Sequence, residues 1–214
     1  MRIGILGSGL MGAKLGTIFA RAGHRVTFSY SHDFGKLEKL ARRAGPNARA
    51  GSPADAADRA DAVLLAVHWS RVDAVLEQAG SLAGQTLITC TLPMDAKDER
   101  LVVGHTTSAA EIIARKRPRA HVVSAFGTAP SEVFFPLFAR RRSKSAPHLA
   151  YCGDHGGAKR RAATLIRAVG FAPVDVGELS MSRYLEPFTM VVAKLAYGGA
   201  GSQALAYRFE RYPR

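Results

Sequence analysis

The glycine pattern Gly7-x-Gly9-x-x-Gly12 constrains the fold more than any other feature of the sequence. It directly follows a short apolar segment, Ile3–Leu6, and opens a helix-like segment that ends at Gly23. In such a strand–turn–helix unit the first glycine permits the tight turn, the second lets a pyrophosphate approach the backbone, and the third lets the helix pack on the strand. Free amides at the helix start then face the phosphates. The pattern predicts a dinucleotide site. Its expected loop contacts are Gly7, Ser8, Gly9, Leu10, Met11 and Gly12.

The end of the next apolar segment, Val26–Phe28, indicates which dinucleotide is bound. Sites for NAD usually place an Asp or Glu there to accept the ribose hydroxyls. In this chain the segment is followed by Ser29, Tyr30, Ser31 and His32. Lys36 comes one helical turn later, and the one nearby acid, Asp33, has the position of a helix N-cap. Hydroxyls and a cation suit a 2′-phosphate, which a carboxylate would repel, so we predict NADP(H).

Apolar and amphipathic segments alternate along the whole chain. The expected strands are Ile3–Leu6, Val26–Phe28, Ala62–Val67, Thr86–Cys90, Val122–Phe126, Leu149–Cys152 and Pro173–Val176. The expected helices are Met11–Ala22, Lys36–Ala44, Trp69–Ala79, Ala109–Arg115 and Ala158–Val169. Near-continuous apolar strands joined by helical crossovers are typical of a mostly parallel sheet covered on both faces. We therefore predict an α/β fold of the Rossmann type, with a doubly wound, mostly parallel sheet and a C-terminal helical segment.

The C-terminal part of the chain is expected to be an appendage of this domain. We assign residues 1–177 to an NADP-binding Rossmann domain and residues 178–214 to a helical segment packed on it, as a single structural unit. Residues 178 to about 207 are expected to form one long helix or a kinked pair, with Pro187 as the candidate kink and Gly198, Gly199 and Gly201 as the candidate break. The apolar residues on one face of that helix are Leu185, Phe188, Val191, Val192 and Leu195. Packing on the sheet is one role for this face, and a homodimer interface, which we expect, is the other.

Composition narrows the class of protein and of partner. Of the 214 residues, 47% are hydrophobic and 22% charged, and the formal net charge is +13. Basic residues gather at 115–119, 140–144, 159–161 and 208–214 without a basic–aromatic repeat, so we expect attraction of anionic ligands but no nucleic-acid binding. No apolar run could span a membrane and no secretory signal is recognisable. Cys90 and Cys152 lack metal-ligand spacing. We expect a cytoplasmic protein without a metal site.

Loops after the later strands are expected to line the same crevice, because the carboxyl ends of parallel strands meet at one edge of a sheet. The expected cofactor contacts in these loops are Val67, His68, Ala125 and Gly127. Ser108 and Glu111 have the spacing of a capping box at a helix start. No side chains have the spacing of a nucleophilic or acid–base site, so no catalytic residue is predicted. That absence suits direct hydride transfer between two bound rings, which the protein need only align and shield from water.

Four stretches of the sequence resemble the coenzyme F-420-dependent NADP oxidoreductase family. They are "IGILGSGLMG" at 3–12, "GHTTSAAE" at 104–111, "HVVSAFGTAP" at 121–130 and "GFAPVDVGELSMSRYLEP" at 170–187, and they span nearly the full length. The nucleotide-binding domain also resembles the reductase portion of the membrane ferric reductases. The chain departs from the family at Gly127, where Asn is common, at Leu92, where the Asn of an Asn-Pro pair is common, and at Tyr30, where Arg is common.

The resemblance implies a homodimeric reductase that binds NADPH across Gly7–Gly12, Ser29–Ser31 and Val67. A flat second substrate, coenzyme F-420 or a flavin, would stack on the nicotinamide near Ala125 and Gly127. The implied reaction is hydride transfer between the nicotinamide and this deazaflavin-like or flavin-like ring. Two alternatives stay open: a redox sensor that binds NADP without turnover, and a hydroxyacid-type or imine-type dehydrogenase.

Overall fold

The computed structural model describes residues 1–31, 33–143 and 145–213. His32, one of the expected 2′-phosphate contacts, lies outside the described residues, as do Lys144 and Arg214 of the basic segments. One sheet runs through the molecule in the order β3-β2-β1-β4-β5-β6-β7-β8. Its strands are β1 (Arg2–Leu6), β2 (Arg25–Ser29), β3 (Ala48–Ala50), β4 (Ala62–Leu65), β5 (Thr86–Thr89), β6 (His121–Ser124), β7 (His148–Gly153) and β8 (Ala172–Asp175).

The strand order creates a switch point at the centre of the sheet. Strand β1 pairs in parallel with β2 on one side and with β4 on the other, so the chain winds outward in both directions from it. Strands β1 to β6 are parallel, whereas β7 pairs antiparallel with β6 and parallel with β8. The predicted doubly wound, mostly parallel sheet is confirmed. In open sheets of this kind, ligands bind outside the carboxyl ends of the strands at the switch point.

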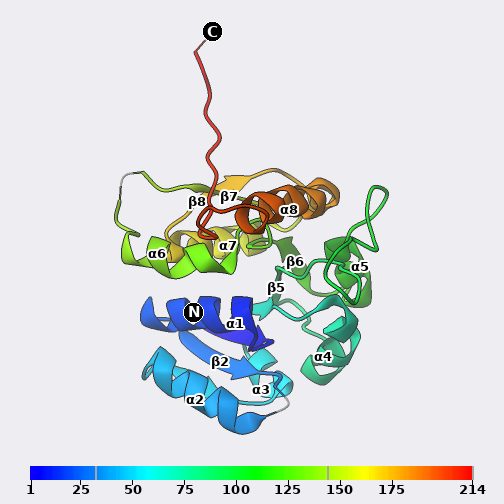
Figure 1. Ribbon diagram of the computed structural model, residues 1–214. Coiled ribbons are helices and arrows are strands. Elements are labelled where there is room, and N and C mark those ends of the chain that lie inside the picture. Colours follow the sequence, from blue (N-terminus) through cyan, green and yellow to red (C-terminus); the bar gives the residue numbers. More distant parts are fainter. Residues whose placement is uncertain (32, 144, 214) are drawn as a thin grey trace.

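Helices cover both faces of the sheet (Figure 1). One layer holds α1 (Leu10–Arg21), α2 (Phe34–Ala44), α6 (Phe134–Ala139) and α7 (Gly156–Val169), and the other holds α3 (Pro53–Ala57), α4 (Val72–Ala79) and α5 (Ala109–Lys116). Each layer closes its own apolar core, the first around Leu15, Phe19 and Phe126, the second around Leu65, Val75 and Ile113. Among the described residues no helix is long and apolar enough to cross a membrane.

The structure corrects several element boundaries. Strand β3 and helices α3 and α6 were not predicted, because three to six residues are too few for a periodic pattern to emerge. The predicted C-terminal helix is shorter than expected: after a turn at Leu179–Met181, helix α8 spans Ser182–Tyr197. The chain then leaves helical geometry at a run of glycines. Tyr207, expected within the helix, instead forms a bridge to His148 of β7.

Candidate functional site

The glycine loop lies between β1 and α1, at the switch point. Gly7 has a φ of +111°, and a Cβ built on it would lie 2.3 Å from the carbonyl oxygen of Ala66. A Cβ on Gly12 would lie 1.9 Å from the carbonyl oxygen of Gly7. Neighbouring backbone atoms therefore leave no room for a side chain at Gly7 or Gly12. Gly9 differs, since no atom lies within 4 Å of its would-be Cβ. The loop is therefore tightly packed at Gly7 and Gly12, and it leaves open space at Gly9, where a ligand would approach.

The start of α1 suits an anion. Its N-cap is Gly9, no side chain caps the helix, and the first turn carries no acidic residue. The first amide groups of the helix have no intrahelical acceptor, and the positive end of the helix dipole lies with them. Leu10 is 72% exposed and does not cover them. The residues present therefore fit the pyrophosphate of a dinucleotide, with backbone amides as donors.

Ser29 has a different role from the one that the sequence suggested. Its side chain is fully buried, and its hydroxyl donates to the carbonyl oxygen of Ile5 at 2.8 Å. The hydroxyl therefore joins β2 to β1 inside the sheet and does not face a 2′-phosphate. Sequence alone could not show this, because a serine at a strand end reads the same whether its side chain points into or out of the core.

Among the described residues after β2, Tyr30 is half-buried against the second apolar core, whereas the residues that follow it are more exposed. Tyr30 has a φ of 63°, so the chain turns sharply there, and its carbonyl oxygen accepts a bond from the Ser8 hydroxyl at 3.4 Å. Ser31 and Lys36 are exposed. Asp33 is the N-cap of α2, as predicted, and its carboxylate accepts from the amide of Lys36. Ser31 and Lys36 are thus left as the described side chains that can meet a 2′-phosphate, while the one carboxylate is engaged in capping.

The loop after β4 contributes backbone and an apolar side chain. A Cβ on Gly7 would lie 2.7 Å from Cγ1 of Val67, so Val67 covers the tight turn. The ring of His68 joins its own loop to the loop after β5: Nδ1 accepts from the Ser70 amide, and Nε2 lies 3.1 Å from the carboxylate of Asp98. The structure therefore places Val67 at the glycine loop and leaves the His68 ring nitrogens already partnered.

An apolar cavity of about 240 Å³ begins at the glycine loop. Its lining includes Leu10 and Met11 of α1, Leu92 and Gly127 of the loops after β5 and β6, and Thr189, Val192, Ala193 and Tyr197 of α8. Ala125 is not among its lining residues: it is 3% exposed and lines a small neighbouring pocket that shares Leu92 and Gly127 with this cavity. A Cβ on Gly127 would have the carbonyl oxygen of Cys90 as its nearest neighbour, at 3.5 Å, which leaves room for a side chain.

Two titratable groups line this cavity, and neither exchanges protons near neutral pH. Burial raises the pKa of the Cys90 thiol to about 12. The pKa of Tyr197 is also raised to about 12, by burial and by its hydrogen bond to the Glu132 carboxylate. Neither of these two groups therefore supplies the cavity with a general acid or base near neutral pH.

A buried polar cluster beside the cavity was missed in the sequence. Both carboxylate oxygens of Glu186 in α8 accept backbone amides at the start of α5, from Ala109 at 2.9 Å and Ala110 at 3.1 Å. Burial raises the pKa of this carboxyl to about 7. The Ser108 and Ser182 hydroxyls meet at 2.6 Å beside it. The pattern "SRYLE" carried no signal for this contact, because its partners lie more than 70 residues away in the chain.

The predicted capping box is confirmed in one half only. The Ser108 hydroxyl accepts the amide of Glu111, as expected. The Glu111 carboxylate does not return to the Ser108 backbone. It accepts two bonds from the Arg183 guanidinium, at 2.6 and 2.9 Å, and one from the Ser108 hydroxyl. These bonds hold the pKa of Glu111 below its usual range. The two family-like stretches at 104–111 and 170–187 therefore interlock α5 with α8.

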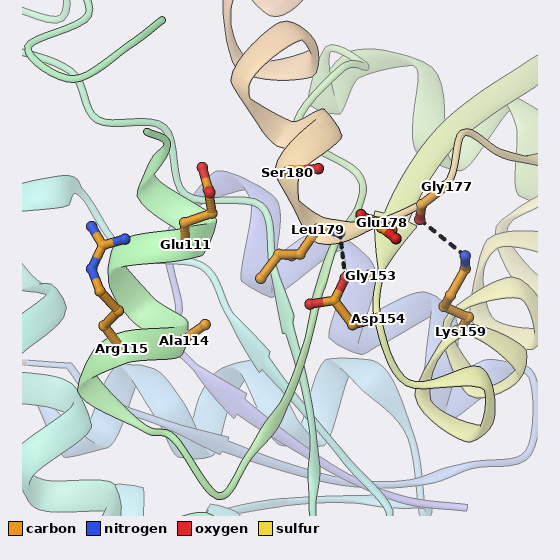
Figure 2. Close-up of a pocket in the computed structure, with 10 residues that line it drawn as sticks. All are labelled: Glu111, Ala114, Arg115, Gly153, Asp154, Lys159, Gly177, Glu178, Leu179 and Ser180. Carbon is orange, nitrogen blue, oxygen red and sulfur yellow. Dashed lines mark hydrogen bonds between the residues drawn. The ribbon is translucent and has the colours of Figure 1, made fainter. Parts of the chain in front are cut away.

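A larger cavity of about 650 Å³ lies away from the glycine loop (Figure 2). It lies between α5, α7 and the turn before α8, and several of its charged groups already have partners. Asp154 accepts the amide of Leu179 at 2.7 Å, and the Lys159 ammonium donates to the carbonyl oxygen of Gly177 at 2.9 Å. Lys159 also pairs with Asp175. Size alone does not make this cavity the site, since the glycine loop and the start of α1 are not among its lining residues.

The N-terminal part of the chain matches a known protein family in sequence. Residues 2–93 match the model of a family described as NADP oxidoreductase, coenzyme F-420-dependent. The predicted resemblance is confirmed, and this match supports an NADP-dependent oxidoreductase and NADP(H) as the dinucleotide. The chain is also 29% identical over 188 residues to Metalloreductase STEAP3 of Rattus norvegicus, a match that covers 86% of this chain. The match spans 36% of that relative's length.

Solved structures share the whole fold. A protein of Arthrobacter sp. FB24, provisionally assigned as an F-420-dependent NADP reductase, has a TM-score of 0.86 at 25% identity, with 99% of this chain and 100% of that chain covered. A hypothetical protein of Sinorhizobium meliloti has a TM-score of 0.73 at 26% identity, with 98% and 96% covered. A reductive aminase of Aspergillus terreus, solved with NADPH, shares the fold with a TM-score of 0.62 at 19% identity, covering 91% of this chain and 61% of that one.

Proposed function

We propose that this protein is an NADPH-dependent reductase that passes hydride to a flat deazaflavin-like or flavin-like acceptor, of which coenzyme F-420 is the first candidate. The observation that carries the proposal is the apolar cavity beside the start of α1. A dinucleotide whose pyrophosphate lies on the α1 amides can direct its nicotinamide into this cavity, where a second ring would stack on it. The matched family and the Arthrobacter protein support this acceptor class.

NADP is favoured over NAD by the groups after β2. Ser31 and Lys36 are exposed there, and the Asp33 carboxylate is held by the amide of Lys36. A cation and a hydroxyl stabilise a 2′-phosphate, whereas ribose hydroxyls alone would leave the Lys36 charge without a partner. We assign the 2′-phosphate to Ser31 and Lys36, and the pyrophosphate to the amides at Gly9, Leu10 and Met11.

The chemistry of the reaction belongs to the two rings. The bound nicotinamide supplies the hydride. The chain aligns the rings between Met11 and Gly127 on one side and α8 on the other, and its apolar lining excludes water. Holding the two rings at contact distance lowers the activation barrier of hydride transfer, and the protein forms no covalent bond with either ring.

The test is calorimetric titration with NADPH and NADH, followed by addition of coenzyme F-420 or FMN to the NADPH complex. Lys36→Met is expected to weaken NADPH about tenfold and NADH little, because one charge-assisted bond is lost. Lys39→Met, an exposed lysine of the same helix, is the matched control. Equal NADPH affinity in wild type and Lys36→Met would contradict the assignment of the 2′-phosphate.

A redox sensor that binds NADP without turnover is the second candidate. It is favoured by the lack of a lining group, among the described residues, that titrates near neutral pH: Cys90 and Tyr197 both have pKa values of about 12. Tight NADPH binding without hydride transfer to F-420, FMN or a ferric chelate would favour the sensor. Steady oxidation of NADPH with any of these acceptors would exclude it.

We also propose a homodimer that uses the outer face of α8. Val191 is 55% exposed and Leu195 is 68% exposed on this face, one helical turn apart. Exposed apolar side chains at this spacing suit a helix–helix contact between two copies. Light scattering of wild type and of a Val191→Lys, Leu195→Lys variant tests it. A dimer that becomes a monomer in the variant is expected, and a wild-type monomer would refute the proposal.

A further inference from the structure

Helix α8 forms one wall of the apolar cavity, opposite the glycine loop. Thr189, Ala193 and Tyr197 line this wall, and Glu186 lies on the same face at helical spacing. Residues three and four apart stack along one side of a helix. The position of this one helical face therefore sets the width of the space left for an acceptor ring.

The first turns of α8 are fixed by buried bonds. Glu186 is 4% exposed and accepts two amides of α5. The Ser182 hydroxyl is fully buried, and Arg183 makes two bonds to Glu111. Figure 2 shows Glu111 on α5 beside the turn that leads into α8. Breaking these contacts would leave buried polar groups without partners, which is costly, so this end of the helix is the fixed one.

The last turn of α8 is held by a different and more exposed set. The Tyr197 hydroxyl donates to Oε2 of Glu132 at 2.7 Å. Oε1 of Glu132 accepts from the Ser131 hydroxyl at 3.0 Å and lies 3.4 Å from the Lys14 ammonium. Tyr197 itself is 52% exposed. Beyond it the chain leaves helical geometry at Gly198, so no further helical turn reinforces this end.

The contacts that hold the two ends of α8 therefore differ in strength. Water competes for the Tyr197–Glu132 bond and is excluded from the Glu186 bonds, and helix ends open at lower cost than buried turns. Lys14 belongs to α1, one turn after the glycine loop, so the Tyr197–Glu132–Lys14 contact ties the acceptor wall directly to the cofactor helix. We call these three residues the latch.

We propose that the latch positions the acceptor wall: when it is closed, α8 is held at the ring-stacking distance from α1, and when it opens, the last turns of α8 move away about the fixed Glu186 end and admit the acceptor. Tyr197 and Glu132 are thus positioning residues for acceptor binding. The identity of the acceptor rests on the function proposed above, whereas the opening of the wall does not.

Cys90 provides a test that needs no turnover. It lines the cavity, whereas Cys152, the other cysteine, is fully buried elsewhere and serves as an internal control. Alkylation of each thiol by iodoacetamide is followed by peptide mass spectrometry. Tyr197→Phe is expected to raise the Cys90 rate about five- to tenfold, the effect of losing one hydrogen bond to a charged group that is partly solvated. The Cys152 rate should stay unchanged. Tyr184→Phe, on the exposed side of α8, is the matched control.

The same variants separate positioning from general destabilisation. Tyr197→Phe should raise the acceptor KM about fivefold, with the NADPH Kd within about twofold of wild type. Equal Cys90 rates in wild type and Tyr197→Phe would overturn the latch. Equal rises at Cys90 and Cys152 would also overturn it, because they indicate global opening. If wild type reduces no acceptor, the proposed function fails, and the Cys90 rates still decide whether the latch exists.

Discussion

The pair Gly9→Ala and Gly12→Ala separates ligand binding from packing within one loop. No atom lies within 4 Å of the added Cβ at position 9, and its φ of −72° is ordinary for alanine. At position 12 the added Cβ would lie 1.9 Å from the carbonyl oxygen of Gly7, so α1 has to shift from the turn. Gly12→Ala should therefore cost about 3 kcal/mol of unfolding free energy, the upper range for overpacking. Gly9→Ala should cost less than about 1 kcal/mol.

The order of the two variants should be reversed for NADPH binding: Gly9→Ala should weaken the affinity more than Gly12→Ala. A methyl group at Gly9 stands where the pyrophosphate approaches the amides, so at least one charge-assisted bond is lost, about 1.5–3 kcal/mol, or about ten- to a hundredfold in Kd. Urea unfolding and calorimetric titration of both variants measure the two effects. The reasoning is refuted if Gly9→Ala binds NADPH as tightly as wild type while keeping its stability.

Three further substitutions test Ser29, Gly127 and Glu186. Ser29→Ala should lose about 1 kcal/mol of stability, the value of its buried bond to Ile5, with no change in the preference for NADPH over NADH in titrations; a specific loss of NADPH affinity would contradict this. Gly127→Ala should keep stability within about 0.5 kcal/mol and raise the acceptor KM, because the added methyl enters the cavity; an unchanged KM would place the acceptor elsewhere. The pKa of Glu186 is about 7 in the folded protein and near 4.5 in the unfolded chain. The free energy of unfolding should therefore fall by about 3 kcal/mol as pH rises between these values, and then level off. Urea titrations of Glu186→Gln should lack this fall.

The parts predicted well from the sequence are those that local patterns determine. The strand before Gly7, the helix after it and the alternation of later segments follow from apolar periodicity and glycine spacing, and they were enough for the doubly wound sheet. The N-cap at Asp33 was predictable because its acceptor and donor are three residues apart. Such features depend on neighbours within a turn or two of chain.

The parts that failed depend on distant partners. The direction of the Ser29 side chain is decided by the Ile5 carbonyl across the sheet, and the role of Glu186 by amides of α5 more than 70 residues away. The end of α8 at Tyr197 agrees with the candidate break at Gly198, but the bond of Tyr197 to Glu132 and the return of the chain to β7 have no sequence signature. A cavity lined by residues from distant parts of the chain likewise has no sequence signature.

The most direct test of the central claim is a single-turnover experiment without oxygen. The protein is loaded with NADPH deuterated at the transferable position and mixed with coenzyme F-420, and the label is then located by mass spectrometry. Direct hydride transfer in the cavity predicts deuterium on the reduced acceptor, at a rate lowered in Gly9→Ala at subsaturating NADPH. Loss of the label to water, or no reduction of F-420 by a protein that binds NADPH tightly, would contradict the account.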